Sequence, residues 1–232
     1  MTARRASRGV RNGIVWAVAV VLVAGAAAYF YLVRSGALTS TDTIDRVVVV
    51  FASQAEDGAE VAQVVALVTD GRDVSLIDPK RTASIPGTSY DKLADAYPFG
   101  GGGAVAAALD GTGVLPYAYV DVPEAEWVAL LQGNAYLRVV VPKPIEVFDG
   151  QRLVSFAEGT QTVPAANVPA LMRGIAYLDS ADRMRVVRAV GEASLYALGA
   201  GAGGEAEVGA EGVRTDLTPD AYARLLASLR AR

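Results

Sequence analysis

A run of 21 residues without a charge, close to the N-terminus, divides this chain into two parts. The segment GIVWAVAVVLVAGAAAYFYLV covers residues 13–33. An α-helix rises about 1.5 Å per residue, so this run would span about 30 Å, the thickness of the hydrocarbon core of a bilayer. We therefore expect a transmembrane helix over 13–33, a basic tail over 1–12, a linker over 34–44 and a separate domain over 45–232.

The charges that flank this run predict its orientation. Arg4, Arg5, Arg8 and Arg11 precede it, and the first 41 residues contain no acid. Basic residues stay on the cytoplasmic side, so we expect a single-pass protein of the cell membrane with a cytoplasmic N-terminus and an extracytoplasmic domain. A cleaved signal peptide is the alternative. The run is longer than the ~7–15 residues of a signal h-region, which favours the anchor.

The composition of the remaining chain excludes several classes of function. Beyond residue 34 there are 16 basic and 25 acidic residues, and this acidic balance argues against nucleic acid as a partner. The chain has neither Cys nor His. Disulfides, Cys/His zinc sites and Ser-His-Asp triads are therefore excluded, and any chemistry must use carboxylates, Arg, Lys, hydroxyls or a hard metal ion.

Apolar runs of strand length alternate with helical patterns along the domain. The sequence predicts a layered α/β domain with a mixed sheet, and Asp70-Gly71 predicts a hairpin between the second and third strands. A Gly/Ala/Glu-rich segment, 199–212, is expected to form a flexible loop. Thr218 is expected to cap a final helix whose buried face carries Tyr222, Leu225, Leu226 and Leu229. The predicted strands are 46–52, 60–68, 73–78, 117–122, 136–141 and 145–149.

An arginine-rich helix offers the first candidate site. Within DSADRMRVVRAV, residues 179–190, Asp182, Arg185 and Arg188 are three apart and lie off an apolar stripe. One interpretation is a solvated face with an ion pair contributing ~0.2–0.5 kcal/mol. The other is a clamp in which planar guanidinium groups bind phosphate. The stripe consists of Met184, Val187, Gly191, Leu195 and Leu198.

Two further segments could bind phosphate. The glycines 100–103 open a helix, where backbone N–H groups can approach an anion, although a flexible turn explains them as well. Lys80 and Arg81 follow a predicted strand, at the usual ligand position of α/β sheets, but exposed cations in a turn are common. The acids Glu56, Asp57 and Glu60 could hold a metal, or they are solvated loop acids.

Taken in order, these segments resemble the LytR-CpsA-Psr (LCP) family of bacterial envelope proteins over about residues 45–230. DVSLIDPKRTASIPG resembles the family's SIPRD…IPG segment, and YDKLADAYPFGGG resembles DKINAAYAYGG. EGTQTV resembles a conserved turn of the family, and TDLTPDAYARLL resembles its closing helix. DRMRVVR reproduces D-x-x-R-x-x-R at Asp182, Arg185 and Arg188.

The resemblance implies an α/β/α domain behind one membrane helix, Mg²⁺ as cofactor, and transfer of glycopolymers from polyprenyl-pyrophosphate carriers to the cell wall. Its implied phosphate-binding residues are Arg185, Arg188, Lys80, Arg81, Arg173, Gly100, Gly101 and Gly102. The sequence also departs from the pattern. Arg81 replaces an acid, AEVAQ replaces the second-strand R-S-D-T that carries a metal-holding aspartate, and Arg173-Gly174 replaces R-x-R.

Two functions follow from the resemblance and its departures. In the first, the protein binds polyprenyl-(pyro)phosphate-linked glycopolymers and, if it is active, transfers them as a phosphotransferase. In the second, it is a non-catalytic module that binds envelope polymer, lipid or a partner protein. The retained arginines favour the first for binding, and the missing acids favour the second for chemistry, because Mg²⁺ needs hard oxygen ligands.

Overall fold

A computed structural model of the chain describes residues 41–55, 58–110, 117–133, 137–201 and 212–232. The predicted membrane helix, 13–33, lies outside these residues. Within the described ranges, no helix combines the length and the apolar character that crossing a membrane requires. Thr41 and Asp42, placed in the linker by the sequence analysis, bind the C-terminal part of the domain: Thr41 exchanges backbone hydrogen bonds with Asp216 and Thr218.

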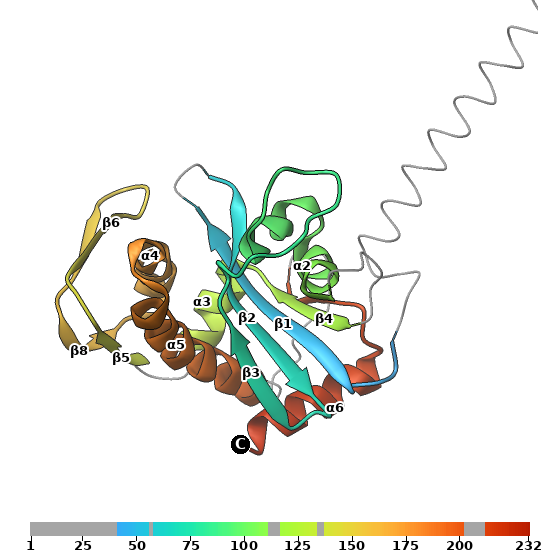
Figure 1. Ribbon diagram of the computed structural model, residues 1–232. Helices are drawn as coiled ribbons and strands as arrows, with labels where there is room; N and C mark the ends of the chain where they lie inside the picture. The colour runs from blue at the N-terminus through green and yellow to red at the C-terminus, as the bar shows by residue number, and fades with distance from the viewer. Residues whose placement is uncertain (1–40, 56–57, 111–116, 134–136, 202–211) are drawn as a thin grey trace, which may run out of the picture. The chain divides into compact units, whose positions relative to one another are not determined.

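A five-stranded mixed sheet forms the centre of the domain (Figure 1). Its order is β3 (Asp73–Ile77), β2 (Glu60–Thr69), β1 (Arg46–Gln54), β4 (Ala118–Val122) and β9 (Arg214–Thr215). Only the β1–β4 pair is parallel, and the other three pairs are antiparallel. The predicted hairpin is confirmed, because Asp70 and Gly71 take positive φ values of 52° and 63° between β2 and β3.

Helices cover both faces of this sheet, which confirms the predicted α/β/α layering. One face packs on η1 (Leu93–Phe99) and α2 (Gly101–Asp110). The other packs on α3 (Glu124–Gln132), α4 (Val168–Gly174), α5 (Ser180–Ala200) and α6 (Pro219–Arg230). Side chains of β1 alternate between the two cores, so the strand is buried on both sides, as its continuous apolar run predicts.

Two hairpin-like pairs extend the domain beside α4 and α5 (Figure 1). β5 (Leu137–Val141) pairs with β8 (Gly159–Val163), and β6 (Ile145–Phe148) pairs with β7 (Leu153–Phe156), both antiparallel. The sequence predicted β5 and β6 but not their partners. Length does not explain the difference, because β5 and β6 are equally short. β8 (GTQTV) has one apolar side chain, that of Val163, and so lacks the apolar pattern of a strand.

The two long helices follow their predicted apolar stripes, and the cap predicted for α6 at Thr218 is confirmed. Asp179 caps α5 by accepting a hydrogen bond from the N–H of Asp182, and Thr218 caps α6 in the same way through Ala221. α5 continues through Gly199 and Ala200, which the sequence analysis had given to the 199–212 loop. α6 packs so closely against this part of α5 that only a glycine fits at position 199. A Cβ there would lie 2.7 Å from the backbone nitrogen of Arg230. Residues 202–211 of the predicted loop lie outside the described ranges.

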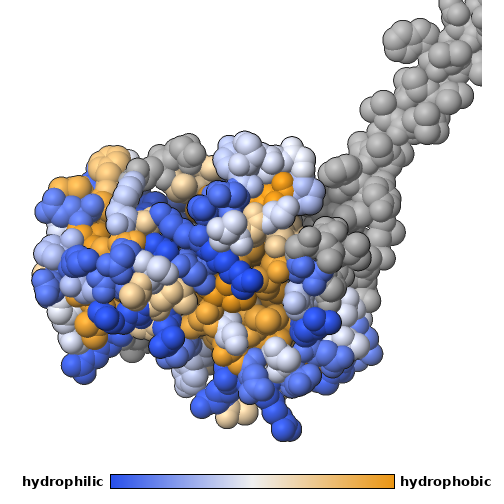
Figure 2. All heavy atoms as spheres, viewed as in Figure 1, coloured by the Kyte–Doolittle hydropathy of each residue, from blue (hydrophilic) through white to orange (hydrophobic). Residues whose placement is uncertain are grey.

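The surface is divided by hydropathy. On the face shown in Figure 2, hydrophobic side chains gather over the strands at the centre of the view, and hydrophilic side chains surround them.

The η2 turn (Ala165–Asn167) precedes α4, and the η3 turn (Ile175–Tyr177) connects α4 to the segment before α5. The η3 turn and η1 lie on two sides of the cavity described next.

Candidate functional site

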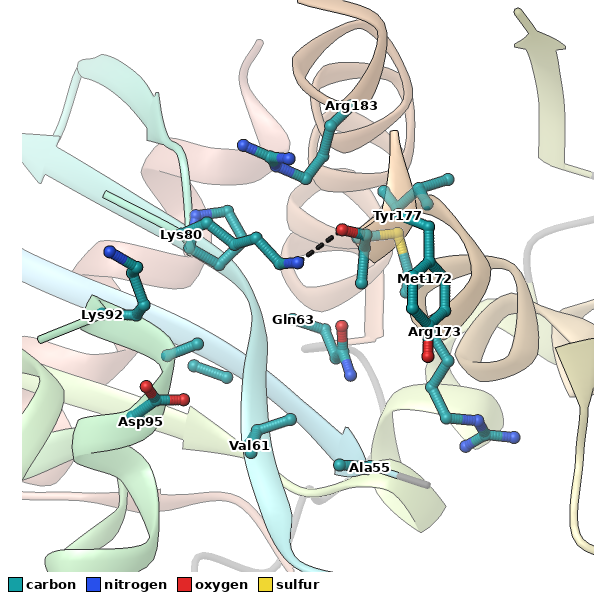
Figure 3. Close-up of a pocket in the computed structure, with 15 residues that line it drawn as sticks. Ala55, Val61, Gln63, Lys80, Lys92, Asp95, Met172, Arg173, Tyr177 and Arg183 are labelled. Atoms are coloured by element: carbon teal, nitrogen blue, oxygen red, sulfur yellow. Dashed lines mark hydrogen bonds between the residues drawn. The ribbon is translucent and has the colours of Figure 1, made fainter. Parts of the chain in front are cut away.

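A cavity of about 410 Å³ opens between β2, the residues after β3, η1 and the α4–η3 segment. Its lining combines two kinds of side chain. An apolar wall is formed mainly by Ala55, Val61, Ala62, Ala94, Met172 and Ile175. Charged and polar groups converge on the same space, and Figure 3 shows Lys92 and Asp95 on one side and Arg173 and Tyr177 on the other. The polar lining residues are Gln63, Lys80, Lys92, Asp95, Arg173, Tyr177 and Arg183.

Lys80, one of the predicted phosphate-binding residues, lies in this cavity. It follows β3 at the position where the sheet ends, and its ammonium group donates a hydrogen bond to the backbone oxygen of Ala176 in η3 (Figure 3). Partial burial lowers the pKa of Lys80, and the nearby Arg183 guanidinium lowers it further. An anion bound beside this ammonium group would raise the pKa of Lys80 again, because it would stabilise the charged form.

Arg183 lines the same cavity and is 8% exposed. Its Nε and Nη2 donate to the two carboxylate oxygens of Asp78 at 3.0 and 2.7 Å, and its Nη1 donates to the backbone oxygen of Leu178. Burial raises the pKa of Asp78, but the hydrogen bonds from Arg183, Lys80 and Ser180 outweigh it and leave that pKa below its usual range. The pair joins the end of β3 to the first turn of α5.

Arg173, Lys92 and Asp95 complete the charged lining. Arg173 donates to the backbone oxygen of Gln54 at 3.0 Å, which holds the end of β1 against α4. Lys92 forms an ion pair with Asp91 at 3.1 Å. Burial raises the pKa of Asp95, and the neighbouring carboxylate of Asp91 raises it further. Of the residues that the structure describes, four cationic side chains and one carboxylate therefore line the cavity.

Arg185 and Arg188, the arginines on which the sequence analysis concentrated, are not brought into this cavity. Both are exposed. Arg185 forms an ion pair with Asp182 at 3.3 Å, and Arg188 lines a separate surface hollow beside β3. A helix turns about 100° per residue, so these two positions lie about 200° and 140° around α5 from Arg183. Arg81 is also exposed and does not line the cavity.

The predicted glycines do not line the cavity either. They lie instead against a carboxylate of the protein itself, that of Asp121. The N–H of Gly102 donates to the carboxylate of Asp121 at 3.2 Å, beneath the first turn of α2. A Cβ on Gly101 or Gly102 would lie 2.8 Å from an atom of Asp121. Asp121 is 1% exposed and also binds Tyr97 and Arg214 at 2.9 and 2.8 Å. The glycine run therefore makes room for a buried carboxylate.

The donor set of the cavity does not fit the Mg²⁺ that the resemblance implies. Among the described residues, no group of three or more acidic side chains could hold a metal ion. Val61 and Ala62, from the segment that replaces the family's second-strand acid, are part of the apolar wall. The acids Glu56 and Asp57 lie outside the described residues. Mg²⁺ prefers hard oxygen ligands, and Asp95 is the one carboxylate among the described residues of the lining.

Arg183, Lys92 and Asp95 were not predicted as site residues. A signal for Arg183 was present, since it lies four residues before Val187 and so falls on the apolar stripe of its helix. A charged residue at a buried position is normally paired, and this points to a partner such as Asp78. Lys92 belongs to the YDKLADAYPFGGG segment that carried the resemblance. Nothing in the sequence distinguished Asp95 from other surface acids.

Similarity to solved structures places this architecture among known proteins. No protein-family model matches the chain, and no curated protein matches it in sequence. Solved structures do match. A LytR-Csp2A-Psr enzyme from Actinomyces oris superposes with a TM-score of 0.53 at 20% identity, over 81% of this chain and 76% of that one.

Two further structures agree with the first. Bacillus subtilis TagV gives a TM-score of 0.50 at 13% identity, over 82% and 81% of the two chains. A protein of Enterococcus faecalis described as a transcriptional regulator gives 0.51 at 19% identity, over 82% and 76%. The domain therefore has an LCP-like fold, with a sequence that has diverged from the members of known structure.

Proposed function

We propose that this chain is a membrane-anchored envelope protein whose cavity binds polyprenyl-(pyro)phosphate-linked glycopolymers during cell-wall assembly. The observation that carries the proposal is one cavity with two chemically distinct halves. Apolar side chains from β2 and α4 form one wall, and four cationic side chains reach the same space. A prenyl phosphate has the same two halves, an apolar chain and a polyanionic head.

The cations suit a phosphate group in kind and in placement. Hydrogen bonds between an ionised donor and an ionised acceptor are about twice as strong as neutral ones, and a guanidinium can bind two phosphate oxygens at once. Arg183 is held in one orientation by Asp78 and Leu178, so it needs little ordering when a ligand binds. The LCP-like fold and the predicted membrane helix over 13–33 support a lipid-linked ligand.

The arrangement favours binding over transfer. Phosphotransfer needs groups that stabilise developing charge and position the reacting oxygens, which acids holding a metal ion would supply. In the described part of the cavity the carboxylate of Asp95 is the one acid in the lining, and Asp78 is occupied by Arg183. We therefore favour a non-catalytic module, whose site binds the lipid-linked polymer without transferring it.

Titration calorimetry with geranyl pyrophosphate tests the proposal on the domain 41–232. Lys80→Met keeps an unbranched side chain that is one atom shorter and removes the charge. We expect the Kd to rise by about tenfold or more, since hydrogen bonds to charged groups contribute ~1.5–3 kcal/mol each. An uncharged prenyl alcohol should bind more weakly than the pyrophosphate.

The matched control is the double variant Arg185→Ala/Arg188→Ala. It removes two positive charges from an exposed side of α5 outside the cavity. We expect its Kd to stay within about twofold of the unmodified domain, because exposed charges are screened. If the unmodified domain does not bind the pyrophosphate, or if the control loses as much affinity as Lys80→Met, the cavity is not the binding site.

A further inference from the structure

We infer that the cavity holds the phosphate groups of its ligand with lysine ammonium groups in place of a divalent cation, so that binding does not require Mg²⁺. This inference rests on the proposed function, because it concerns how the same cavity holds the same class of ligand. It differs from what the LCP resemblance implies. Lys80 and Lys92 are the residues that the inference rests on. Asp95 distinguishes binding by lysines from binding through Mg²⁺, because removing its charge should lower the Kd in the first case and raise it in the second.

The balance of charge in the lining favours an anion and disfavours a second cation. Among the described residues, Lys80, Lys92, Arg173 and Arg183 line the cavity with one carboxylate, that of Asp95; Asp91 and Asp78, which pair with Lys92 and Arg183, do not line it. Like charges a few ångströms apart repel more strongly inside a protein than in water. A divalent cation entering this space would meet that repulsion, whereas a pyrophosphate group would be attracted by the same four side chains.

Asp78, which binds Arg183 and the backbone N–H of Lys80, has no free carboxylate position for a metal ion. One of its oxygens accepts from Arg183 Nε and from the N–H of Lys80, at 3.0 and 2.9 Å. The other accepts from Arg183 Nη2 and Ser180 Oγ, at 2.7 and 2.9 Å. A metal ion would have to displace Arg183, which would leave a nearly buried guanidinium without its partner.

Among the described residues that line the cavity, Asp95 is the one remaining carboxylate, and it lies close enough to both lysines to feel their charge. The positive charges of Lys92 and Lys80 both act on its carboxylate. Figure 3 shows Asp95 and Lys92 on the same side of the cavity, with Lys80 next to them. Burial and the carboxylate of Asp91 raise the pKa of Asp95 despite the two ammonium groups. A single carboxylate of this kind is a poor ligand for Mg²⁺, which keeps its waters unless several hard oxygens replace them.

Lys80 is positioned to act as the cation instead. Its ammonium group is fixed by the backbone oxygen of Ala176, and an ammonium has three N–H donors, so two remain for a ligand. The Lys92 ammonium group contacts the carboxylate of Asp91, which is exposed and precedes it in the sequence. A phosphate bound between them would be neutralised from the η1 side and from the η3 side of the cavity.

Titration with geranyl pyrophosphate in EDTA and in excess Mg²⁺ tests the inference. We expect the Kd of the unmodified domain to change by less than about threefold between the two buffers. Asp95→Asn removes a negative charge beside the ligand and should lower the Kd by about three- to tenfold in both buffers. Glu146→Gln is the matched control: Glu146 is exposed on β6 and does not line the cavity, so its loss should leave the Kd within about twofold.

Each contrary result overturns a specific statement. Binding that appears only with Mg²⁺, or a higher Kd for Asp95→Asn in Mg²⁺, would mean that Asp95 ligates a metal, and would refute the inference while leaving the proposed function intact. An equal decrease in Kd for Asp95→Asn and Glu146→Gln would mean that only the net charge of the domain matters, and would also refute the inference. An absence of binding in both buffers would refute the proposed function itself.

Discussion

At the scale of single residues, a buried hydrogen bond between two helices is open to a direct test. The indole N–H of Trp127 in α3, which is fully buried, donates to Ser194 Oγ in α5 at 2.8 Å. Ser194→Ala would leave this donor buried and unpaired, so we expect a loss of about 1–3 kcal/mol in the free energy of unfolding. Denaturant unfolding measures it.

Two controls separate this hydrogen bond from the loss of a hydroxyl as such. Ser228→Ala removes a hydroxyl that bonds only to Leu225 of its own helix, and should change stability by less than about 0.5 kcal/mol. In a Trp127→Phe background there is no indole donor to leave unpaired, so Ser194→Ala should have a smaller effect. An equal loss in both backgrounds would contradict the role of the bond.

Asp216 should make the stability of the domain depend on pH. It is 5% exposed, and burial raises its pKa to about 6, against a value of 3.8 when unfolded. Between these values the folded state keeps a proton that the unfolded state loses. The stabilisation from this residue is therefore full below pH 3.8 and lost as pH rises toward 6, by up to about 3 kcal/mol.

Asp216→Asn isolates this contribution, because an amide oxygen can still accept the hydrogen bond from the N–H of Tyr119. The variant should gain stability relative to the unmodified domain as pH is raised from 4 to 7, measured by denaturant unfolding at each pH. Parallel stability curves for the two proteins would show that Asp216 titrates alike in the folded and unfolded states.

At the scale of helices and strands, close approach of α5 and α6 depends on one glycine. A Cβ at Gly199 would lie 2.7 Å from the nitrogen of Arg230 and 3.0 Å from the carbonyl carbon of Leu229, both backbone atoms that cannot rotate away. We expect Gly199→Ala to destabilise the domain by about 1–3 kcal/mol, more than the higher helix propensity of alanine restores. Thermal unfolding is the measurement.

Gly133, at the end of α3, provides the control for this substitution. It is exposed, its φ and ψ are −68° and −20°, and the nearest atom to an added Cβ is 3.7 Å away. Gly133→Ala should therefore be neutral or stabilise by up to about 1 kcal/mol. Similar losses at both glycines would mean that helix contact at Gly199 is not what limits the substitution.

At the scale of the whole molecule, the arginines before residue 13 predict a cytoplasmic N-terminus and an extracytoplasmic domain. Protease added to spheroplasts that express the full chain should degrade the domain and leave an N-terminal tag protected. Detergent lysis, which opens both compartments, should expose the tag as well. Protection of the domain in intact spheroplasts would reverse the predicted topology.

The sequence by itself determined the features of this protein that depend on neighbouring residues. The strands from β1 to β6 and the cap of α6 were predicted from apolar periodicity and from the side chain of Thr218. These signals act over a few residues, where backbone geometry and burial period fix the local structure. The order of the motifs was also sufficient to predict the layered α/β/α domain.

The tertiary structure alone decided which charges meet. Spacing placed Arg185 and Arg188 together, but the packing of α5 on the sheet turns Arg183 toward Asp78, which is 105 residues earlier in the chain. The glycine run had the pattern of an anion site, and its anion is Asp121 on β4. Such pairs are fixed by how whole elements pack, because a side chain finds a distant partner only after the intervening chain has folded back.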